Sequence, residues 1–593
     1  MRINPDTGKP LYRPLRVFAF DPSRGVGASN FVTIDVPYEE QKPGPCGQHI
    51  MVIDYDGSND RYYAPLDLDD PVVMVSNGLD PSESDPHFHQ QMVYAVVSEA
   101  IRRFEFALGR PVKWRFRTGA RDDPNRRKLR IFPHGMQAAN AYYSRDLRAL
   151  VFGYFQAVEA DAGTNLPGQT VFTCLSHDII VHETTHAILD SLREHFMDLT
   201  GPDTQAFHEA FADVIALFQH FTFKDALVDT IRRSGGLLHR RELRPVVPPS
   251  GGTAIQAERP AVNPLIGLAQ QFGEAMGTRQ ALRSAIGSEP DPKALEKATE
   301  PHTRGSILVA AVFDAFFTAY LGRVQDLLAL GRSAGWVAEN QLHPDLAQRL
   351  AKEAAKTAAH FRNMCIRAMD YSPPLDMTFG DFLRALITAD YELVPEDNHM
   401  YRAALIDAFR ARGIVPEGVR SYSEQSLVWS RPDEEGNGGA LRCPGLNFEA
   451  RHSTAARQQQ AQRNGVLLSQ FGKAHAEALG LSPDRPVQAF SYHQLNRVGP
   501  DGQLKVQVVA ELIQHQPVRL DGGTEVTLHG GSTVMFDADG LLRYAIHKDV
   551  SSPRRLERWR QFQAELQQRR SGAAYREWTP QTQMRFDLVH RGY

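Results

Sequence analysis

Short apolar runs alternate with clusters of Pro, Gly and Asp over the first 78 residues of the chain. The runs RVFAF, FVTIDV and HIMVIDY are each long enough for one strand. Apolar runs bounded by turn-forming residues are typical of strands joined by tight loops. The pattern therefore predicts a strand-rich N-terminal segment over residues 1–78.

Helical spacing begins near residue 84. Asp85 and Pro86 form a helix-start signal, and apolar residues then recur every three or four positions through QQMVYAVVSEAIRRFEFALG. Three strand-like pieces follow, VKWRF, KLRIF and ALVFGYFQA, before helical spacing dominates from about Ser176 to Arg412. A strand-rich lobe followed by a helical lobe predicts an α+β unit over residues 79–415, with a cleft between the lobes.

The most apolar stretch of the chain, Ile307 to Leu321, is interrupted by Asp314 and is shorter than a membrane span. We therefore expect it to form a buried core helix.

The pattern changes again after the helical region. Residues 416–445 are polar and rich in Gly and Pro, which is typical of a linker. A helical pair is predicted up to about Leu481, followed by hairpin strands with Asp-Gly turns and a basic C-terminal helix. These elements predict a smaller, strand-rich domain over residues 446–593, against which the basic helix is expected to pack.

Composition narrows the possible functions. A chain of 593 residues with 42% hydrophobic and 23% charged residues is typical of a soluble globular protein. A formal charge of −4 gives no large positive field, so we expect no nucleic-acid partner. The four cysteines form no CxxC pair, which argues against a disulfide framework. The N-terminus shows no signal-peptide pattern, so we expect a cytoplasmic protein without membrane contact, although export without a signal stays open.

Candidate metal chemistry lies in the helical pattern around residue 182. His182, Glu183 and His186 form an H-E-x-x-H motif, flanked by apolar residues at helical spacing. Positions i and i+4 share one helix face, so two imidazoles can bind one metal ion while the glutamate reaches a water on that ion. The pattern predicts a buried, metal-binding helix.

A second helical pattern, HEAFAD at residues 208–213, supplies acids. Glu209 is the candidate third ligand. Asp213, one turn further on, can accept the free N–H of His182 or His186, and Asp190 can play a similar orienting role. The alternative is a core helix with two buried histidines and incidental acids nearby.

These segments together resemble the thermolysin-like gluzincin metallopeptidases. The resemblance is carried by GQTVFTCLSHDIIVHETTHAILD and HEAFAD, by Asn140-Ala141-Tyr142-Tyr143 with LVFGYF, and by PHTRGSILVAAVFDAF with His302. The four segments stand in the family's order and span about residues 85–415. The resemblance implies a two-lobe peptidase domain that binds one zinc ion and hydrolyses a protein or peptide substrate.

The resemblance also implies individual roles. Glu183 would act as general base on a zinc-activated water, and His302 would donate to the oxyanion. Asn140 and Ala141 would bind an extended peptide by strand addition. Arg283 is a candidate for the arginine that binds the substrate carbonyl, with a solvated helix arginine as the alternative.

Three positions depart from the family pattern. Met197 stands where the family has an oxyanion-binding tyrosine, and His195 is a nearby candidate replacement. His220 stands where a calcium-binding acid is expected near Asp178, so paired calcium ions are doubtful. The acid that orients the second catalytic histidine has no clear match, although Glu300 is close to His302 in sequence.

Two other histidines and a cysteine have simpler interpretations. His87 and His89 form an HxH pair that we expect on the surface at a helix start, and Cys174 is expected in the core.

Three functions stay open from the sequence. The leading one is a zinc metallopeptidase. A catalytically weak or inactive gluzincin that serves as a protein-binding module is the alternative that Met197 favours. The third is a zinc hydrolase of non-peptide amides. The sequence gives neither substrate specificity nor oligomeric state.

Overall fold

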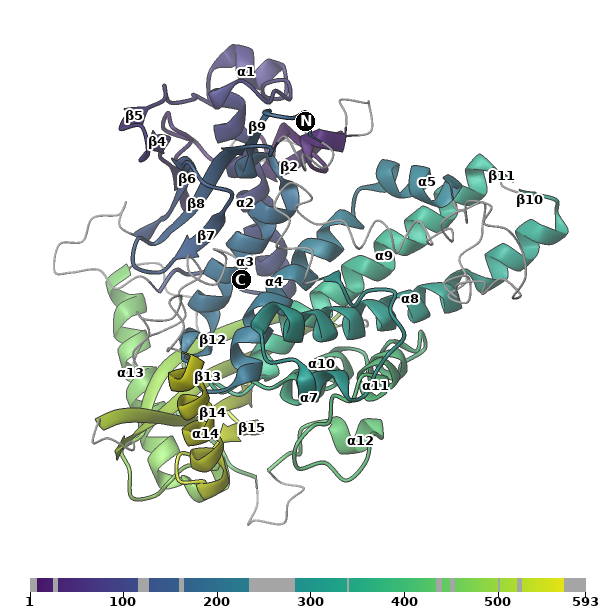
Figure 1. The fold of residues 1–593 in the computed structure, drawn as a ribbon. Helices are drawn as coiled ribbons and strands as arrows, with labels where there is room; N and C mark the ends of the chain where they lie inside the picture. Colours follow the sequence, from purple (N-terminus) through teal and green to yellow (C-terminus); the bar gives the residue numbers. More distant parts are fainter. Residues whose placement is uncertain are drawn as a thin grey trace.

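The computed structural model shows an α+β architecture, as the sequence predicts: a mixed N-terminal sheet, long helices in the middle and an antiparallel C-terminal sheet (Figure 1). The described residues are 8–24, 30–115, 127–158, 165–233, 283–338, 341–432, 440–447, 454–499, 502–519 and 525–569.

The N-terminal sheet has the strand order β3-β6-β8-β7, and β9 pairs with β8 beyond the end of β7. β3, β6 and β8 run parallel, whereas β7 and β9 run antiparallel to β8. Because β3 comes from the first 78 residues, that segment and the region after it share one sheet. The strands are β3 (Ile50–Val52), β6 (Leu129–Met136), β7 (Ala141–Ser144), β8 (Ala149–Gln156) and β9 (Thr170–Phe172).

Helix α2 (Pro86–Leu108) begins where the sequence predicts. The carboxylate of Asp85 accepts a hydrogen bond of 3.0 Å from the backbone N–H of His87, and Pro86 occupies the first turn. Gly109 ends the helix with φ of 69°, a left-handed conformation that favours glycine. Small elements nearby are β1 (Tyr12–Phe18), β2 (Phe31–Pro37), β4 (Tyr55–Asp56), β5 (Arg61–Tyr62) and α1 (Pro71–Val75).

The strand predicted at VKWRF is not formed in the described part of that segment. Residues 112–115 have no strand assignment, and Phe116 lies outside the described residues.

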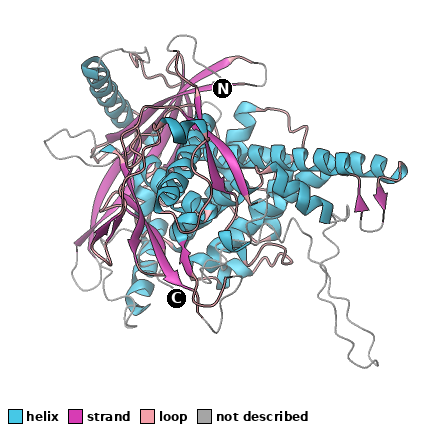
Figure 2. Cartoon of the chain, turned by 90° about the horizontal axis from the view of Figure 1, so that it is seen from above, coloured by secondary structure: helices cyan, strands magenta, loops and turns pink. Residues whose placement is uncertain are grey.

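Long helices fill the middle of the molecule. Helix α3 (His177–Leu192) contacts both β7 and α4 (Pro202–His220), and α4 contacts α8 (Pro301–Ser333) and α9 (Pro344–Ala368). All 16 residues of α3 are buried, as expected for a helix with apolar residues on every side. The two long helices α8 and α9 extend away from the sheets (Figure 1), and Figure 2 shows from above long helices that project beyond the large sheets. Further elements are α5 (Lys224–Arg233), α7 (Ala294–Lys297), β10 (Val337–Ala338), β11 (Gln341–Leu342), α10 (Phe379–Leu393), α11 (Tyr401–Ala411) and α12 (Glu424–Leu427).

Helix α8 is long and apolar enough to cross a membrane by length and composition alone. However, 78% of its most apolar window is buried inside the molecule. The helix packs against α4, α9 and α11, as a core helix does. The prediction of a core helix at Ile307–Leu321 is confirmed.

The C-terminal sheet has two buried faces. Its strands pair in the order β12-β13-β14-β15, all antiparallel, and successive residues of β13 alternate between the faces. Val509 belongs to the core shared with the helical region, whereas Val508 and Ala510 pack under α13 (Thr454–Ala474). The strands are β12 (Gln488–Val498), β13 (Leu504–Arg519), β14 (Glu525–Asp537) and β15 (Leu542–Lys548), which confirms the predicted hairpin strands.

Polar groups also join this sheet to the rest of the chain. Glu511 of β13 points toward the helical region, where its carboxylate accepts a hydrogen bond of 2.7 Å from Nη1 of Arg193. Arg193 is the residue directly after α3, and both partners are buried. The backbone N–H of Asn496 in β12 donates to the carbonyl of Gly109 at the end of α2. The C-terminal sheet is thus in contact with two helices of the α+β unit.

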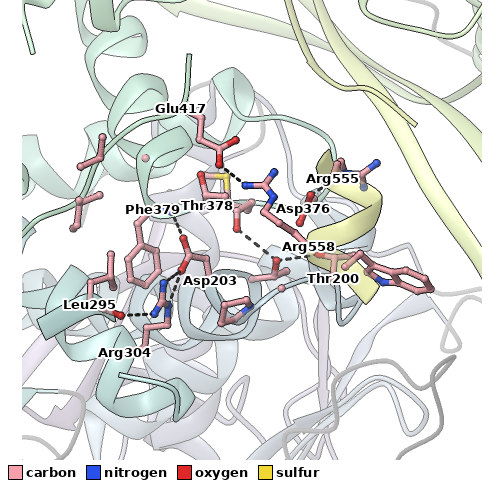
Figure 3. Close-up of a pocket in the computed structure, with 18 residues that line it drawn as sticks. Thr200, Asp203, Leu295, Arg304, Asp376, Thr378, Phe379, Glu417, Arg555 and Arg558 are labelled. Atoms are coloured by element: carbon pink, nitrogen blue, oxygen red, sulfur yellow. Dashed lines mark hydrogen bonds and ion pairs between the residues drawn. The ribbon is translucent and has the colours of Figure 1, made fainter. Parts of the chain in front are cut away.

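The C-terminal helix α14 (Pro553–Arg569) packs against both the C-terminal sheet and the helical region. Between α14, α4, α8 and α10 lies a cavity of about 240 Å³ (Figure 3). Its acids face arginines, so the charges of the lining are largely compensated within the cavity wall. The ion pairs are Asp203–Arg304, Asp376–Arg555 and Glu417–Arg558.

Candidate metal centre

The structure brings His182, His186 and Glu209 together at the contact between α3 and α4. The Nε2 atoms of the two histidines are 3.0 Å apart. The Glu209 carboxylate lies 3.3 Å from Nε2 of His182 and 3.7 Å from Nε2 of His186. All three side chains are fully buried. The predicted grouping of these residues is therefore present in the fold.

This geometry fits a bound metal ion. Donor atoms held about 2.0–2.1 Å from a tetrahedral ion lie about 3.3 Å apart, close to the three separations observed here. A buried carboxylate is costly unless a cation or hydrogen bonds compensate it. Two imidazole nitrogens and one carboxylate oxygen are the donors that zinc accepts while keeping a position open. The residues present thus match the ion that the sequence implies.

His208 lies behind His186. The Nδ1 atoms of the two rings are 2.8 Å apart, so this contact fixes the orientation of the His186 ring. Burial lowers the pKa of His208 to about 3, which keeps its imidazole neutral. The sequence analysis did not select His208, although it directly precedes Glu209 on α4.

The acids predicted around the site have other partners. Asp213 is paired with Arg283, whose Nε lies 3.0 Å from Oδ1 of the carboxylate. Arg283 is only 1% exposed, so the alternative of a solvated arginine is wrong. The role of Asp213 behind a ligand histidine stays a prediction.

Asp178, the position that resembles a calcium ligand, is close to two basic side chains. His220 lies 2.8 Å from its Oδ1, and Nη1 of Arg283 lies 3.5 Å from its Oδ2. Burial alone would raise the pKa of Asp178, but His220 and Arg283 lower it below the ordinary value. Basic groups therefore stand where calcium ligands are expected in the family.

Tyr143 of β7 connects the sheet to α3 at two points. Its backbone N–H donates 2.8 Å to Oε2 of Glu183, and its hydroxyl donates 2.7 Å to Asp190. Asp190 also lies 3.0 Å from Nη2 of Arg145. Burial raises the pKa of Asp190 to about 6, against the opposing effect of Arg145. Asp190 thus binds the strand, whereas the prediction gave it a histidine partner.

Strand β7 is the edge of its sheet on the side of Glu183. The backbone carbonyl of Asn140 accepts a hydrogen bond from the N–H of Gly153 in β8, and the pairing continues with Ala141 opposite Phe152. In an antiparallel pair the backbone groups of alternate residues face away from the partner strand. The backbone of Ala141 therefore faces the same side as the Tyr143 N–H, toward the metal centre.

His302 stands at the start of α8 and faces the same carboxylate. Its Nε2 lies 3.7 Å from Oε2 of Glu209, and its Nδ1 lies 2.7 Å from Oε1 of Glu300. Burial would raise the pKa of Glu300, but its bonds to the ring and backbone of His302 and to the N–H of Thr303 lower it to about 2. Glu300 is therefore the acid that orients His302, which the sequence analysis noted only as a neighbour.

Met197, at the position where the resemblance predicts a tyrosine, lies in the core. Met197 is 1% exposed and belongs to the main hydrophobic cluster. His195 bonds to Asp198 at 2.8 Å, and its ring lies tilted against that of His529 in the C-terminal sheet, with ring centroids 4.6 Å apart. The contacts of His195 thus include the C-terminal sheet, and its oxyanion role stays a prediction.

A second buried group lies away from this centre. His89, expected on the surface, is 1% exposed, and its ring contacts His134 of β6. His87, its partner in the HxH pair, has a side chain that is 43% exposed. The surface prediction is right for His87 and wrong for His89, because His89 lies on the same α2 face as the buried residues Val93 and Val96.

The functional interpretation of the metal centre rests on its own geometry. The described residues form a buried His-His-Glu group that can hold a metal ion. Glu183, on the same helix as the two histidines, accepts a hydrogen bond from the edge strand β7. Neither a scan against models of known protein families nor a search of curated proteins finds a match for this chain.

Proposed function

We propose that the protein is a zinc-dependent metallopeptidase. The observation that carries the proposal is the placement of Glu183 between the His182–His186–Glu209 group and the edge strand β7. An extended peptide added to this edge would pass directly over the metal centre. Strand addition thus supplies both the means of binding the substrate and its position relative to the catalytic residues.

Glu183 is the proposed general base. Its carboxylate is fully buried and held at one oxygen by the Tyr143 N–H, so the other oxygen is oriented for proton transfer. When bound, zinc supplies Lewis acidity that lowers the pKa of a coordinated water and polarises the scissile carbonyl. Glu183 takes the proton of the attacking water and later delivers it to the leaving amine.

His302 is the proposed donor to the oxyanion. Glu300 accepts from its Nδ1, and Nε2 is directed toward the Glu209 carboxylate and the metal centre. Nε2 can donate as well when the ring carries a second proton as an imidazolium. A hydrogen-bond donor placed where charge develops in the transition state lowers the barrier without reorganisation. His302 can fill this role without the tyrosine that Met197 replaces.

Substrate contacts are proposed for the backbone of β7, for Asn140 and for Arg283. Asn140 accepts from the N–H of Ala141 through its side-chain oxygen at 2.9 Å, which shapes the start of the edge strand. Arg283 lies buried beside Asp213, and its contact with a substrate carbonyl stays a prediction.

The alternative is a protein-binding module with little or no hydrolysis. Met197, which cannot donate a hydrogen bond, favours it. The complete set of base, ligands and oriented His302 favours catalysis, because a binding surface has no need for a buried carboxylate poised beside a metal centre.

The test compares wild type with Glu183→Gln. We expect wild type to contain zinc and to cleave unfolded casein, and the variant to retain zinc while losing about 10²–10⁴-fold in rate. Glu296→Gln, at an exposed glutamate of α7, is the matched control and should keep both properties. If wild type binds zinc without cleaving, the protein-binding alternative is favoured. A wild type that binds no zinc after reloading would contradict the metal centre itself.

A further inference from the structure

A second cluster of metal-binding side chains lies in the N-terminal lobe. His89 of α2, His134 of β6 and Cys174 each offer a donor atom, and these atoms lie within 4.8 Å of one another. The three residues are 1%, 2% and 0% exposed. They come from segments far apart in the sequence and are brought together by the packing of α2 against the sheet.

The outer nitrogen of each ring faces a hydrogen-bond acceptor. Nδ1 of His134 lies 2.7 Å from Oδ1 of Asp54, and Nε2 of His89 lies 3.1 Å from the carbonyl oxygen of Glu83. Asp54 is itself buried, and its other oxygen accepts from Nε2 of Gln90 at 2.9 Å. Both outer nitrogens are therefore placed to carry a proton.

The inner nitrogens then face each other with their lone pairs. Nδ1 of His89 and Nε2 of His134 are 2.7 Å apart. A neutral imidazole carries only one N–H, so two rings that both donate outward have no proton left to share. Either an extra proton enters this network, on a ring or on Asp54, or a cation lies between the rings.

We propose that this cluster binds a thiophilic metal ion, Zn²⁺ or Cu⁺, through His89 Nδ1, His134 Nε2 and the Cys174 thiolate. Imidazole and thiolate are the donors that these ions prefer. Metal-bound histidines almost always donate their second N–H to a carboxylate or a backbone carbonyl, the two acceptors found here. One cation satisfies both lone pairs and the thiolate together.

The two histidine rings need only a small adjustment to accept the ion. Two ligands of a tetrahedral ion lie about 3.3 Å apart, so the rings must separate by about 0.6 Å. The ring of Phe172 lies 4.7 Å from His89 and 5.5 Å from His134, and the ring of Tyr63 lies 4.9 Å from His134. This aromatic shell excludes substrate, so the ion has a structural role.

The position of Cys174 indicates which part of the fold the ion would stabilise. Cys174 lies in the short turn Thr173–Leu175, which comes directly before α3 and its metal ligands. The hydroxyl of the adjacent Thr173 donates 2.9 Å to the carbonyl of Gly153 in β8. An ion at this cluster would tie α2, β6 and the start of the catalytic helix to one point.

Cobalt substitution of the full-length protein tests the proposal. A thiolate bound to Co²⁺ gives a charge-transfer band in the near ultraviolet, whereas the His182–His186–Glu209 centre contains no sulfur. We expect wild type to bind two cobalt ions and to show this band, and Cys174→Ala to bind one ion and to lose it. Cys365→Ala, which removes another buried cysteine, is the control and should keep the band.

The ions present in the purified protein identify the natural occupant. Elemental analysis distinguishes two zinc ions from one zinc and one copper, and either result supports the cluster. A folded wild type that takes up cobalt without the charge-transfer band would overturn the proposal. The short contact between His89 and His134 would then be explained by an extra proton in their hydrogen-bond network.

A second variant separates this proposal from the proposed function. His186→Ala should lose hydrolysis and one ion but keep the thiolate band, because the two groups share no ligand. If the band disappears in His186→Ala while circular dichroism shows a native fold, the thiolate-bound ion depends on His186, and the proposal of a separate cluster is wrong. If the wild-type protein has no peptidase activity but shows the thiolate band, the proposed function fails while the metal cluster proposed here stands.

Discussion

The two histidine clusters differ in what surrounds them. The His182–His186–Glu209 group lies beside an edge strand, an acid and the oriented His302. The His89–His134–Cys174 group is enclosed by aromatic rings, and its histidines bind Asp54 and the Glu83 carbonyl. Both present nitrogen atoms at separations close to those of metal ligands.

This difference teaches that the donor set alone does not define a catalytic metal site. Catalysis needs a base, a donor for the developing charge and a route for the substrate. The residues proposed for these roles, Glu183, His302 and the edge strand β7, lie beside the first cluster. An enclosed cluster can use the same histidine chemistry to stabilise the fold. Variants at the first cluster should therefore change hydrolysis, and variants at the second should change stability.

The largest effect is expected from His186→Ala. Under the proposed function, loss of a ligand removes the metal that the reaction needs, so hydrolysis should fall on the order of 10⁴-fold or more, as when a catalytic group is removed. The measurement is the rate of casein cleavage with zinc content determined in parallel. His87→Ala, at an exposed histidine, should retain the wild-type rate. Equal losses in both variants would show that the loss in His186→Ala does not come from the His182–His186–Glu209 group.

A smaller effect is expected from His302→Ala. Zinc binding should persist, whereas kcat should fall about 10²–10³-fold with little change in KM, because the lost hydrogen bond forms in the transition state. Steady-state kinetics on a defined peptide measure this separation. A change confined to KM would instead place His302 in substrate binding.

Metal removal should reveal the contribution of the closed cluster to stability. For a ligand present at about 100 times its Kd, the gain in unfolding free energy is about 2.7 kcal/mol. We expect a chelator to lower the stability of Cys365→Ala by the same amount as wild type. Cys174→Ala should lose less, since one of its two ions is already missing. Thermal unfolding with and without chelator, in the inactive Glu183→Gln background, gives the comparison.

The smallest effect is expected from Glu300→Gln. Loss of the acid that orients His302 should lower kcat/KM about 10-fold. Because the pKa of Glu300 is lowered from 4.5 to about 2, wild type should have its full stability advantage above pH 4.5 and lose it as the pH falls toward 2. Urea unfolding between pH 3 and 7 checks this trend. A constant or growing advantage at low pH would contradict it.

The sequence was sufficient where the determining contacts are local. His182 and His186 are one turn apart, so helical geometry alone brings their side chains to one face. Asp85 and Pro86 likewise marked the start of α2 correctly, because capping involves only adjacent residues. The α+β class followed from the change of apolar spacing along the chain.

The sequence was insufficient where contacts depend on strand register or on packing of distant segments. His134 meets His89 only because β6 lies under α2, and Tyr143 reaches both Glu183 and Asp190 only because β7 lies along α3. The burial of His89 was detectable in principle, since Val93 and Val96 follow it at helical spacing. Its partners were not, because no local pattern connects them.

The two-faced C-terminal sheet has a consequence for how this protein can be shortened. A chain ended before β12 would uncover the core side chains that Leu495, Val509, Met535, Tyr544 and Ile546 now cover. Exposure of an apolar surface of this size costs on the order of 10 kcal/mol, which equals the whole stability of many domains. Arg193 would at the same time lose the carboxylate of Glu511 at the end of α3. Expression of the chain up to the start of β12 alone should therefore yield aggregated protein, and the minimal soluble fragment should extend through β15.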